Sequence, residues 1–338
     1  MSASDLARID ASRQTLADIA ASSRDAERRL RRRTPASPLT HSPALSRLCG
    51  CEVLLKCEHL LPGGSFKFRG GYTKLSRLSE VERRRGVVAA STGNHGLALA
   101  IAGRELGVPV TVHAPASASA AKLQAIADQG AKLVLHEGDP LAAEIAGRAA
   151  ADADNLTYVS PYNDPDVVAG QGSLAVELLD QAPTLDAVVV AVGGGGLLSG
   201  VGAVMATCGR NVEVVAAWPA NAVSLLHSMR AGKAVPVDET PTISDATAGG
   251  VEPGSVTIGI AAAIAPTCVE VDEARIVSGM RRLAEHEHWI VEGAAGLALA
   301  GLEASAGRLK GRNVAVVVCG RNITLDRFLG AISQVTAI

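Results

Sequence analysis

The chain has 338 residues, of which 48% are hydrophobic and 20% charged, and its formal net charge is −2 at pH 7. This length and apolar content exclude a disordered protein, no apolar run reaches the roughly 18 residues of a membrane span, and the charge lacks the basic excess of nucleic-acid binders. With 35 glycines and only 2% aromatic residues, the core must consist of Ala, Val, Leu and Ile, which is typical of buried parallel strands.

The N-terminal region gives no sign of export. Met1–Leu6 is polar and no apolar segment with a cleavage site follows it, so we expect no secretory signal. The six cysteines are sparse and form no C-x-x-C pair, which indicates a reduced, cytoplasmic protein in which Cys49 and Cys51 are small buried residues. The basic run Arg28–Arg33 has no interleaved aromatic residue and follows acidic ones, so we interpret it as a solvated helix end.

A first series of alternating elements runs from residue 86 to residue 159. Short β-branched runs alternate with stretches that carry Ala and Leu at helical spacing, and Gly or Pro stands at the joints. We expect strands at Val87–Ala90, Val108–His113, Ala131–Leu135 and Leu156–Val159, and helices at Asn94–Leu106, Ser117–Gln129 and Pro140–Ala151.

A second series follows the loop at 160–166. The expected strands are Asp186–Val192, Val212–Ala217 and Asn313–Val318, and the expected helices are Gln171–Asp180, Leu197–Ala206, Ala222–Ala231, Glu273–His286 and Gly293–Ala304. Repeated βα units predict an α/β fold with two mostly parallel sheets, each covered by helices on both faces. A ligand of such a fold lies beyond the carboxyl ends of the strands.

The tetraglycine loop Gly193–Gly196 joins a predicted strand directly to a predicted helix that begins with Leu197. Successive N–H groups and the helix N-terminus together form a phosphate cradle, although a flexible turn is the plain alternative. A nucleotide P-loop would need Lys-Ser/Thr after the glycines, and a dinucleotide fingerprint would need a third glycine in register. Neither is present, so the loop predicts a site for a single phosphate.

Lys67 stands between Phe66 and Phe68, two of only three phenylalanines in the chain. An apolar setting lowers the pKa of an ammonium group, which suits an amine that attacks a carbonyl and forms a Schiff base. The alternative is a surface lysine at a helix start, with its stem on apolar neighbours.

The segment Ser91-Thr92-Gly93-Asn94-His95-Gly96 lies at the end of the first strand of the 86–159 series. Hydroxyls, N–H groups and an amide meet there at a positive helix end, which predicts a seat for a carboxylate, with ordinary N-capping as the alternative. His95 is a base or a structural histidine. Cys319, at the end of the last predicted strand, is either inert core or a ligand contact.

Together these four features suit pyridoxal phosphate, with Lys67 on the aldehyde, the glycines on the phosphate and an amino acid against Ser91–His95. The sequence also resembles the fold-type-II pyridoxal-phosphate enzymes of the threonine/serine dehydratase and serine racemase group. The matching motifs occur in the family's order: Ser65–Gly70, Ser91–Gly96, Gly193–Leu197, Glu292–Gly296 and Cys319–Asn322. The resemblance implies a large cofactor-binding domain of residues 1–80 and 161–338 and a small substrate-binding domain of residues 81–160.

The resemblance also implies roles for individual residues. Lys67 would form the Schiff base and then act as the base at Cα, and Asn94 would bond the phenolic oxygen of the cofactor. The other implied cofactor contacts are Phe66 behind the ring, Gly193, Gly194, Gly195, Gly196 and Leu197 at the phosphate, Glu292, and Cys319 at the pyridine nitrogen. The implied substrate contacts are Ser91, Thr92, Gly93, Asn94 and His95.

The implied activity is that of a dehydratase (ammonia-lyase) that converts a β-hydroxy amino acid such as L-threonine or L-serine to a 2-oxo acid and ammonia. Thr92 stands where racemases have a serine proton donor, so Thr92 is a candidate catalytic residue and racemisation is less favoured. The family's metal-binding acidic residues are absent from Trp218–Ser224, so we expect no metal. A homodimer without nucleic-acid or membrane partners is also implied.

Several alternatives stay open. The Ser91–Gly96 and Cys319–Asn322 motifs are more similar to the hydroxyectoine-utilisation dehydratases than to housekeeping threonine deaminases. A racemase or a β-replacement synthase would use the same cofactor. From a different class, the chain could be an αβ nucleotide-binding module without catalytic activity.

Overall fold

A computed structural model describes residues 3–138 and 140–333, and its strands form two sheets. The larger sheet has the order β1 (Leu39–His41), β2 (Glu52–Lys56), β10 (Asn313–Val317), β7 (Ala187–Ala191), β8 (Glu213–Pro219) and β9 (Thr267–Val271). The smaller has the order β5 (Lys132–His136), β4 (Val110–Pro115), β3 (Val87–Ala90) and β6 (Thr157–Tyr158). Among the strands of the described residues, β1 and β2 are the one antiparallel pair, and all other pairs are parallel. The predicted α/β fold with mostly parallel sheets is confirmed.

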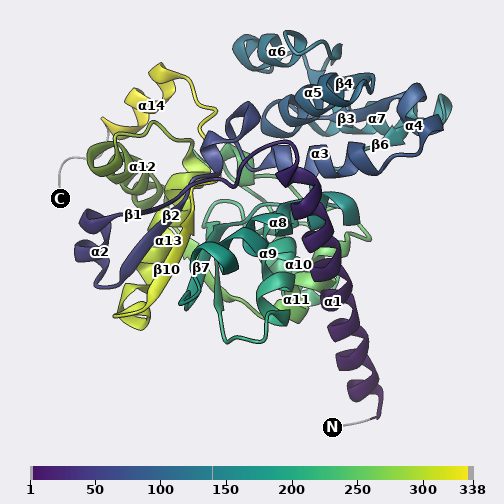
Figure 1. The fold of residues 1–338 in the computed structure, drawn as a ribbon. Coiled ribbons are helices and arrows are strands. Elements are labelled where there is room, and N and C mark those ends of the chain that lie inside the picture. Colours follow the sequence, from purple (N-terminus) through teal and green to yellow (C-terminus); the bar gives the residue numbers. More distant parts are fainter. Residues whose placement is uncertain (1–2, 139, 334–338) are drawn as a thin grey trace.

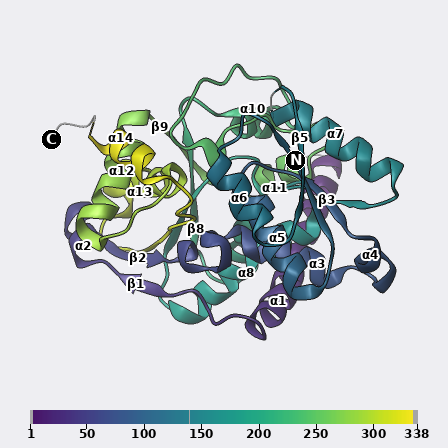
Figure 2. The same ribbon diagram turned by 90° about the horizontal axis from the view of Figure 1, so that it is seen from above.

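Helices cover both sheets, as Figures 1 and 2 show. Around the larger sheet lie α1 (Ala3–Arg31), α2 (Pro43–Cys49), α8 (Pro165–Gln181), α9 (Gly196–Thr207), α10 (Ser224–Ala231), α11 (Val256–Ile264), α12 (Glu273–Glu287), α13 (Gly293–Leu309) and α14 (Leu325–Ile332). The smaller sheet carries α4 (Glu80–Arg85), α5 (Asn94–Leu106), α6 (Ala120–Ala127) and α7 (Pro140–Ala153). Helix α3 (Lys67–Arg77) contacts both α5 and α8 and so lies between the two groups.

The core of the larger sheet explains its apolar sequence. All five residues of β7 are buried, because β10 and β8 flank this strand and α13 packs on it. A strand covered on both faces needs apolar side chains at every position and not at alternate ones. The run at 187–191 therefore has no polar residue.

The structure corrects several predicted boundaries. Helix α8 starts at Pro165, six residues before the predicted Gln171, because Asp164 caps it by accepting from the N–H groups of Asp166 (2.8 Å) and Val167 (3.2 Å). The glycines inside α8 weaken the helical pattern of its first half in the sequence. An added Cβ at Gly170 would lie 2.6 Å from the backbone oxygen of Arg69, so this glycine permits close packing of α8 on α3.

The ends of most other predicted elements differ by up to three residues, and α13 ends at Leu309, five residues beyond the predicted Ala304. Some elements were not predicted. The second strand of the small sheet is at Val110–Pro115 and not at 108–113, and its following helix is the shorter Ala120–Ala127. Strands β1, β2 and β9 and helices α2, α3, α4, α11 and α14 were not predicted, and of α1 only the end near Arg28–Arg33 was. In the described part of the chain, no helix combines the length and apolarity needed to cross a bilayer.

Candidate active site

Backbone hydrogen bonds join the chain segments that follow β2 and β10, at the carboxyl edge of the larger sheet. The N–H of Phe66 donates to the backbone oxygen of Cys319 at 3.0 Å, and Ser65 forms an isolated bridge with Gly320. Lys67 is the first residue of α3. These backbone contacts therefore fix the start of α3 beside Cys319, as two of the four sequence motifs predicted.

The side chain of Lys67 is partly buried. Its Nζ donates to the backbone oxygen of Pro161 at 2.9 Å and stands 5.2 Å from the centre of the Phe66 ring. Burial lowers the pKa of Lys67 from its usual 10.5 to about 8, although the nearby Glu292 and Cys319 act in the opposite direction. A substantial fraction of this amine is thus neutral, and nucleophilic, close to physiological pH.

The tetraglycine loop packs so tightly that side chains are excluded. A Cβ at Gly194 would lie 2.5 Å from the ring of Tyr162, and one at Gly193 would lie 2.8 Å from Cα of Thr247. Gly195 has a left-handed φ of 89° and directly precedes α9. Within the described chain no acceptor takes the N–H groups of Gly194, Gly195 or Gly196. These donors at a helix N-terminus are available to an anion.

The lysine and the glycine loop share one neighbouring segment, at residues 160–162. Pro161 accepts from Lys67 Nζ at 2.9 Å, and its oxygen lies 3.6 Å from where a Cβ of Gly196 would stand. Tyr162 covers Gly194 from the same segment. The structure thus brings the predicted amine and the predicted phosphate cradle together, although they are more than 120 residues apart in sequence.

The segment Ser91–Gly96 joins β3 to α5. Ser91 Oγ accepts from the N–H of Gly93 at 3.2 Å, whereas the N–H groups of Asn94 and His95 have no acceptor within the described residues. Because α5 starts here, these free donors suit a carboxylate. The position agrees with the predicted seat, and Thr92 and Gly93 are both partly exposed.

The side chain of His95 is buried and does not lie on the surface of the predicted carboxylate site. The side chain is 3% exposed, and its Nε2–H donates to the backbone oxygen of Val159 at 2.9 Å. Burial and the charge of Lys67 lower the pKa of His95 to about 3, so the ring is neutral. This geometry favours the structural role that the sequence left open.

Cys319 is buried, and burial raises the pKa of its thiol well above the usual value, with the charge of Glu292 adding to the effect. The side chain is therefore a neutral thiol at physiological pH. Glu292, also buried, accepts hydrogen bonds from Asn94 Nδ2 at 2.9 Å on both carboxylate oxygens. Both residues thus belong to the same site as Lys67.

Several residues near the site escaped the sequence analysis. Lys122 on α6 approaches the seat, with Nζ 3.9 Å from where a Cβ of Gly93 would stand, and it pairs with Asp245 at 3.3 Å. Asp245 also pairs with Arg327 at 2.8 Å. Lys122 lies in a helix that covers the smaller sheet, and no local sequence pattern marks it as a residue of the site.

The loop at 249–254 contacts the site through Tyr162. The N–H of Glu252 donates to the Tyr162 hydroxyl at 3.1 Å, and the Glu252 carboxylate pairs with Arg148 of α7. Ser224 lies in the segment Trp218–Ser224, where the sequence lacks the family's metal-binding carboxylates. Its N–H and its hydroxyl both donate to Glu239. No cluster of three or more potential metal ligands occurs in the described ranges.

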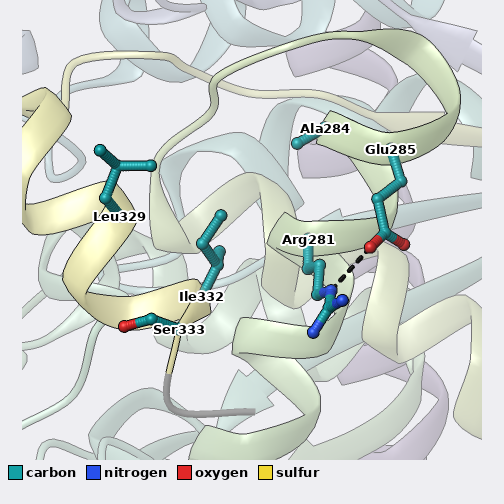
Figure 3. A pocket seen from close by; sticks show the side chains of 6 residues that line it. All are labelled: Arg281, Ala284, Glu285, Leu329, Ile332 and Ser333. Carbon is teal, nitrogen blue, oxygen red and sulfur yellow. Dashed lines mark hydrogen bonds and ion pairs between the residues drawn. The ribbon is translucent and has the colours of Figure 1, made fainter. Parts of the chain in front are cut away.

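A hollow of about 480 Å³ lies elsewhere, between α12 and α14 (Figure 3). Its lining residues are Arg281, Ala284, Glu285, Leu329, Ile332 and Ser333. Arg281 and Glu285 bond each other at 2.7 Å, and no residue of the four sequence motifs lines this hollow. We therefore do not assign it to the active site.

Comparison with known proteins identifies the family. The sequence model described as "Pyridoxal-phosphate dependent enzyme" matches residues 31–320. An L-threonine ammonia-lyase of Thermotoga maritima is 36% identical over 92% of this chain and 76% of that protein. An L-threo-3-hydroxyaspartate ammonia-lyase of Pseudomonas is 34% identical over 86% of this chain and 91% of that protein. The structure of maize serine racemase matches with a TM-score of 0.85 at 25% identity, over 93% of this chain and 96% of that one.

Proposed function

Since the chain belongs to the pyridoxal-phosphate dependent enzymes, we propose that it is an ammonia-lyase for a β-hydroxy amino acid such as L-threonine or L-serine. The products are a 2-oxo acid and ammonia. The observation that carries the proposal is the shared contact of Lys67 and the tetraglycine loop with residues 160–162. Ammonia-lyases among the relatives support the reaction type.

The residues present fit the cofactor. The free N–H groups at 194–196 would hold its phosphate, in a loop that an added Cβ would fill, and Lys67 offers an amine that burial keeps partly neutral. When bound, pyridoxal phosphate supplies an aldehyde that joins amino groups and a ring that withdraws electrons from the bonds at Cα.

We assign the remaining steps to this chain's own side chains. The free N–H groups of Asn94 and His95 hold the substrate carboxylate and orient Cα toward Lys67. The amine of Lys67 would take the proton from Cα as a general base. Loss of the β-hydroxyl as water and later uptake of water balance the conversion, because the net products are the 2-oxo acid and ammonia.

Cys319 biases the reaction toward elimination. Because its thiol is neutral, it offers no negative charge that would keep a ring nitrogen protonated. With the neutral Cys319 thiol beside it, the ring of a bound cofactor would withdraw electrons less strongly, and this would favour loss of the β-hydroxyl over racemisation. Racemisation needs a donor on the opposite face, and Thr92 is the candidate at that position.

A second substrate class follows from Lys122. Its ammonium group lies beside the seat and shares Asp245 with Arg327, so one carboxylate faces two cations at this rim. The surplus positive charge suits a substrate with a second carboxylate, such as L-threo-3-hydroxyaspartate. Lys122→Met should raise KM for the dicarboxylate more than for L-threonine, and equal effects on both substrates would exclude this selectivity.

A substrate panel tests the proposed function. Release of 2-oxo acid and ammonia should be measured with L-threonine, L-serine and L-threo-3-hydroxyaspartate, with and without a chelator, and the enantiomer of unreacted serine should be determined. Activity on at least one substrate, lost in Lys67→Ala, supports the lyase. Interconversion of enantiomers without release of 2-oxo acid would instead establish a racemase.

We also propose that the enzyme is a cytoplasmic homodimer, as the resemblance implies. Sedimentation equilibrium of the purified chain tests the assembly directly. A monomer at micromolar concentration would contradict it, and fractionation of the source cells would test the compartment.

A further inference from the structure

Glu292 lies at the start of α13, in a position that packing fixes closely. Its N–H donates to the backbone oxygen of Gly320 at 3.2 Å, and its side chain is 4% exposed. A side chain at Gly320 would overlap both carboxylate oxygens of Glu292. The carboxylate therefore packs directly against Gly320, which has to be a glycine to make room for it.

A chain of hydrogen bonds leads from this carboxylate across the site. Asn94 Nδ2 lies 2.9 Å from both oxygens of Glu292, and Asn94 Oδ1 accepts from Asn322 Nδ2 at 2.5 Å. Asn322 Nδ2 also donates to the backbone oxygen of Gly63 at 2.7 Å. The chain joins α5 of the small sheet to the start of α13 and to the segment after β10.

The two ends of this chain determine which way each amide faces. The carbonyl of Gly63 only accepts, so Asn322 must turn its NH₂ group toward it and toward Asn94. Asn94 therefore turns its oxygen to Asn322 and its NH₂ group to Glu292, which only accepts when ionised. Reversing the Asn94 amide would set two donors against each other at one end and two acceptors at the other.

We propose that Glu292 is a positioning residue whose carboxylate, with Asn322 opposite it, fixes the orientation of the Asn94 amide within the cofactor site. Glu292 thus acts on the cofactor site through Asn94. The proposal deepens the proposed function and rests on it for the position of the cofactor beside Asn94. An amide oriented before binding does not have to be ordered when the cofactor arrives, and this increases the affinity.

The charge on Glu292 depends on its surroundings. Asp245 on η3 (Asp245–Thr247) and Lys122 on α6 face it from the rim, and Lys67 and Cys319 face it from inside the site. Burial raises the pKa of Glu292 to about 7, although the hydrogen bond from Asn94 lowers it in part. A protonated carboxyl has an O–H donor in place of one acceptor, so the hold on Asn94 weakens below neutral pH.

The test compares cofactor binding by apoproteins, measured as the Kd for pyridoxal phosphate by fluorescence titration. Glu292→Gln keeps the shape but loses an acceptor, and should weaken binding about 10- to 100-fold. Asn94→Ala should weaken it similarly, and the double variant should be no weaker than Asn94→Ala, because Glu292 acts through Asn94. Glu303→Gln, a matched change on the same helix paired with Arg282, should leave Kd unchanged.

Separate readouts distinguish the possible failures. The melting temperature of each apoprotein shows whether a variant is folded, and the wild-type Kd should vary with pH around neutrality more than that of Glu292→Gln. Additive losses in the double variant, or a wild-type Kd in a folded Glu292→Gln, would overturn the positioning role. Absence of cofactor binding by the wild type would contradict the proposed function itself.

Discussion

A group of buried, charged side chains around Arg69 of α3 allows a quantitative prediction for the substitution Glu177→Gln. Arg69 donates to Glu58 at 2.6 Å and 2.9 Å and to Glu177 at 2.8 Å and 2.9 Å, and Lys56 donates to Glu177 at 2.6 Å. All four side chains are at most 4% exposed. Arg31, whose side chain is 35% exposed, also donates to Glu177 at 2.7 Å. Among the four buried side chains two cations balance two carboxylates, so removal of the Glu177 charge leaves a buried excess of positive charge.

Two estimates of the free energy of unfolding that Glu177→Gln loses agree. Breaking a buried ion pair on one side costs about 3–5 kcal/mol. Burial alone would raise the pKa of Glu177, but Arg69 and Lys56 outweigh it and lower the pKa from 4.5 to about 2. A difference of that size at about 1.4 kcal/mol per pH unit corresponds to roughly 3 kcal/mol. Glu177→Gln should therefore destabilise the protein by about 3 kcal/mol.

The pH dependence has a definite sign. A carboxyl whose pKa is lower in the folded state stabilises the fold above its unfolded pKa of 4.5 and loses that contribution as the pH falls toward about 2. The difference between wild type and Glu177→Gln should be full at pH 7 and should shrink below pH 4.5. Urea denaturation followed by circular dichroism at pH 7 and pH 3.5 measures both values.

A surface pair provides the control. Glu80 and Arg84 bond at 3.1 Å with side chains 82% and 70% exposed, so Glu80→Gln should cost less than about 1 kcal/mol. If Glu177→Gln were as stable as Glu80→Gln at pH 7, the buried charges would not stabilise the start of α3 and the reasoning would be refuted.

Three further predictions concern the site. Gly194→Ala should abolish measurable cofactor affinity, because the added Cβ would lie 2.5 Å from the Tyr162 ring. In Gly259→Ala the added Cβ meets no atom within 4 Å, so this control should bind normally in the same fluorescence titration. Equal affinities of the two variants would contradict the tight packing of the glycine loop. The rate at which apoprotein joins pyridoxal phosphate should rise with pH, reach half of its maximum near pH 8, the pKa of Lys67, and level off above that. A half-maximum near pH 10 would show an ordinary lysine. Cys319→Ser keeps a neutral partner and should retain lyase activity of the same order in a steady-state assay, whereas complete loss would assign the thiol a chemical role.

Local sequence signals were sufficient for the elements that have clear periodicity and end signals. The helix Asn94–Leu106 has the predicted bounds, because Gly93 precedes it and Gly107, at a left-handed φ of 68°, ends it. By contrast, the predicted helix Gln171–Asp180 misses the first six residues of α8, where Gly170 weakens the helical pattern, and Gly172 lies within it. Their tight packing against other helices cannot be known before the tertiary structure.

The site was predictable where its chemistry is concentrated in short motifs, and hidden where it depends on distant pairs. Lys67 and the tetraglycine loop each carry a local signal, and their common neighbour at 160–162 is visible only in the fold. The contact of Asn94 with Glu292 spans 198 residues, and that of Arg69 with Glu177 spans 108. Charged residues are usually exposed, so nothing in the sequence marked these as buried.

The anchoring of the cofactor on one lysine can be tested by reduction with borohydride followed by peptide mass mapping. Purified protein incubated with pyridoxal phosphate should carry a single phosphopyridoxyl group after reduction, on the peptide that contains Lys67. The same treatment of Lys67→Ala should give no modified peptide. A modification on another lysine in the wild type, or no modification at all, would contradict the assignment of the site.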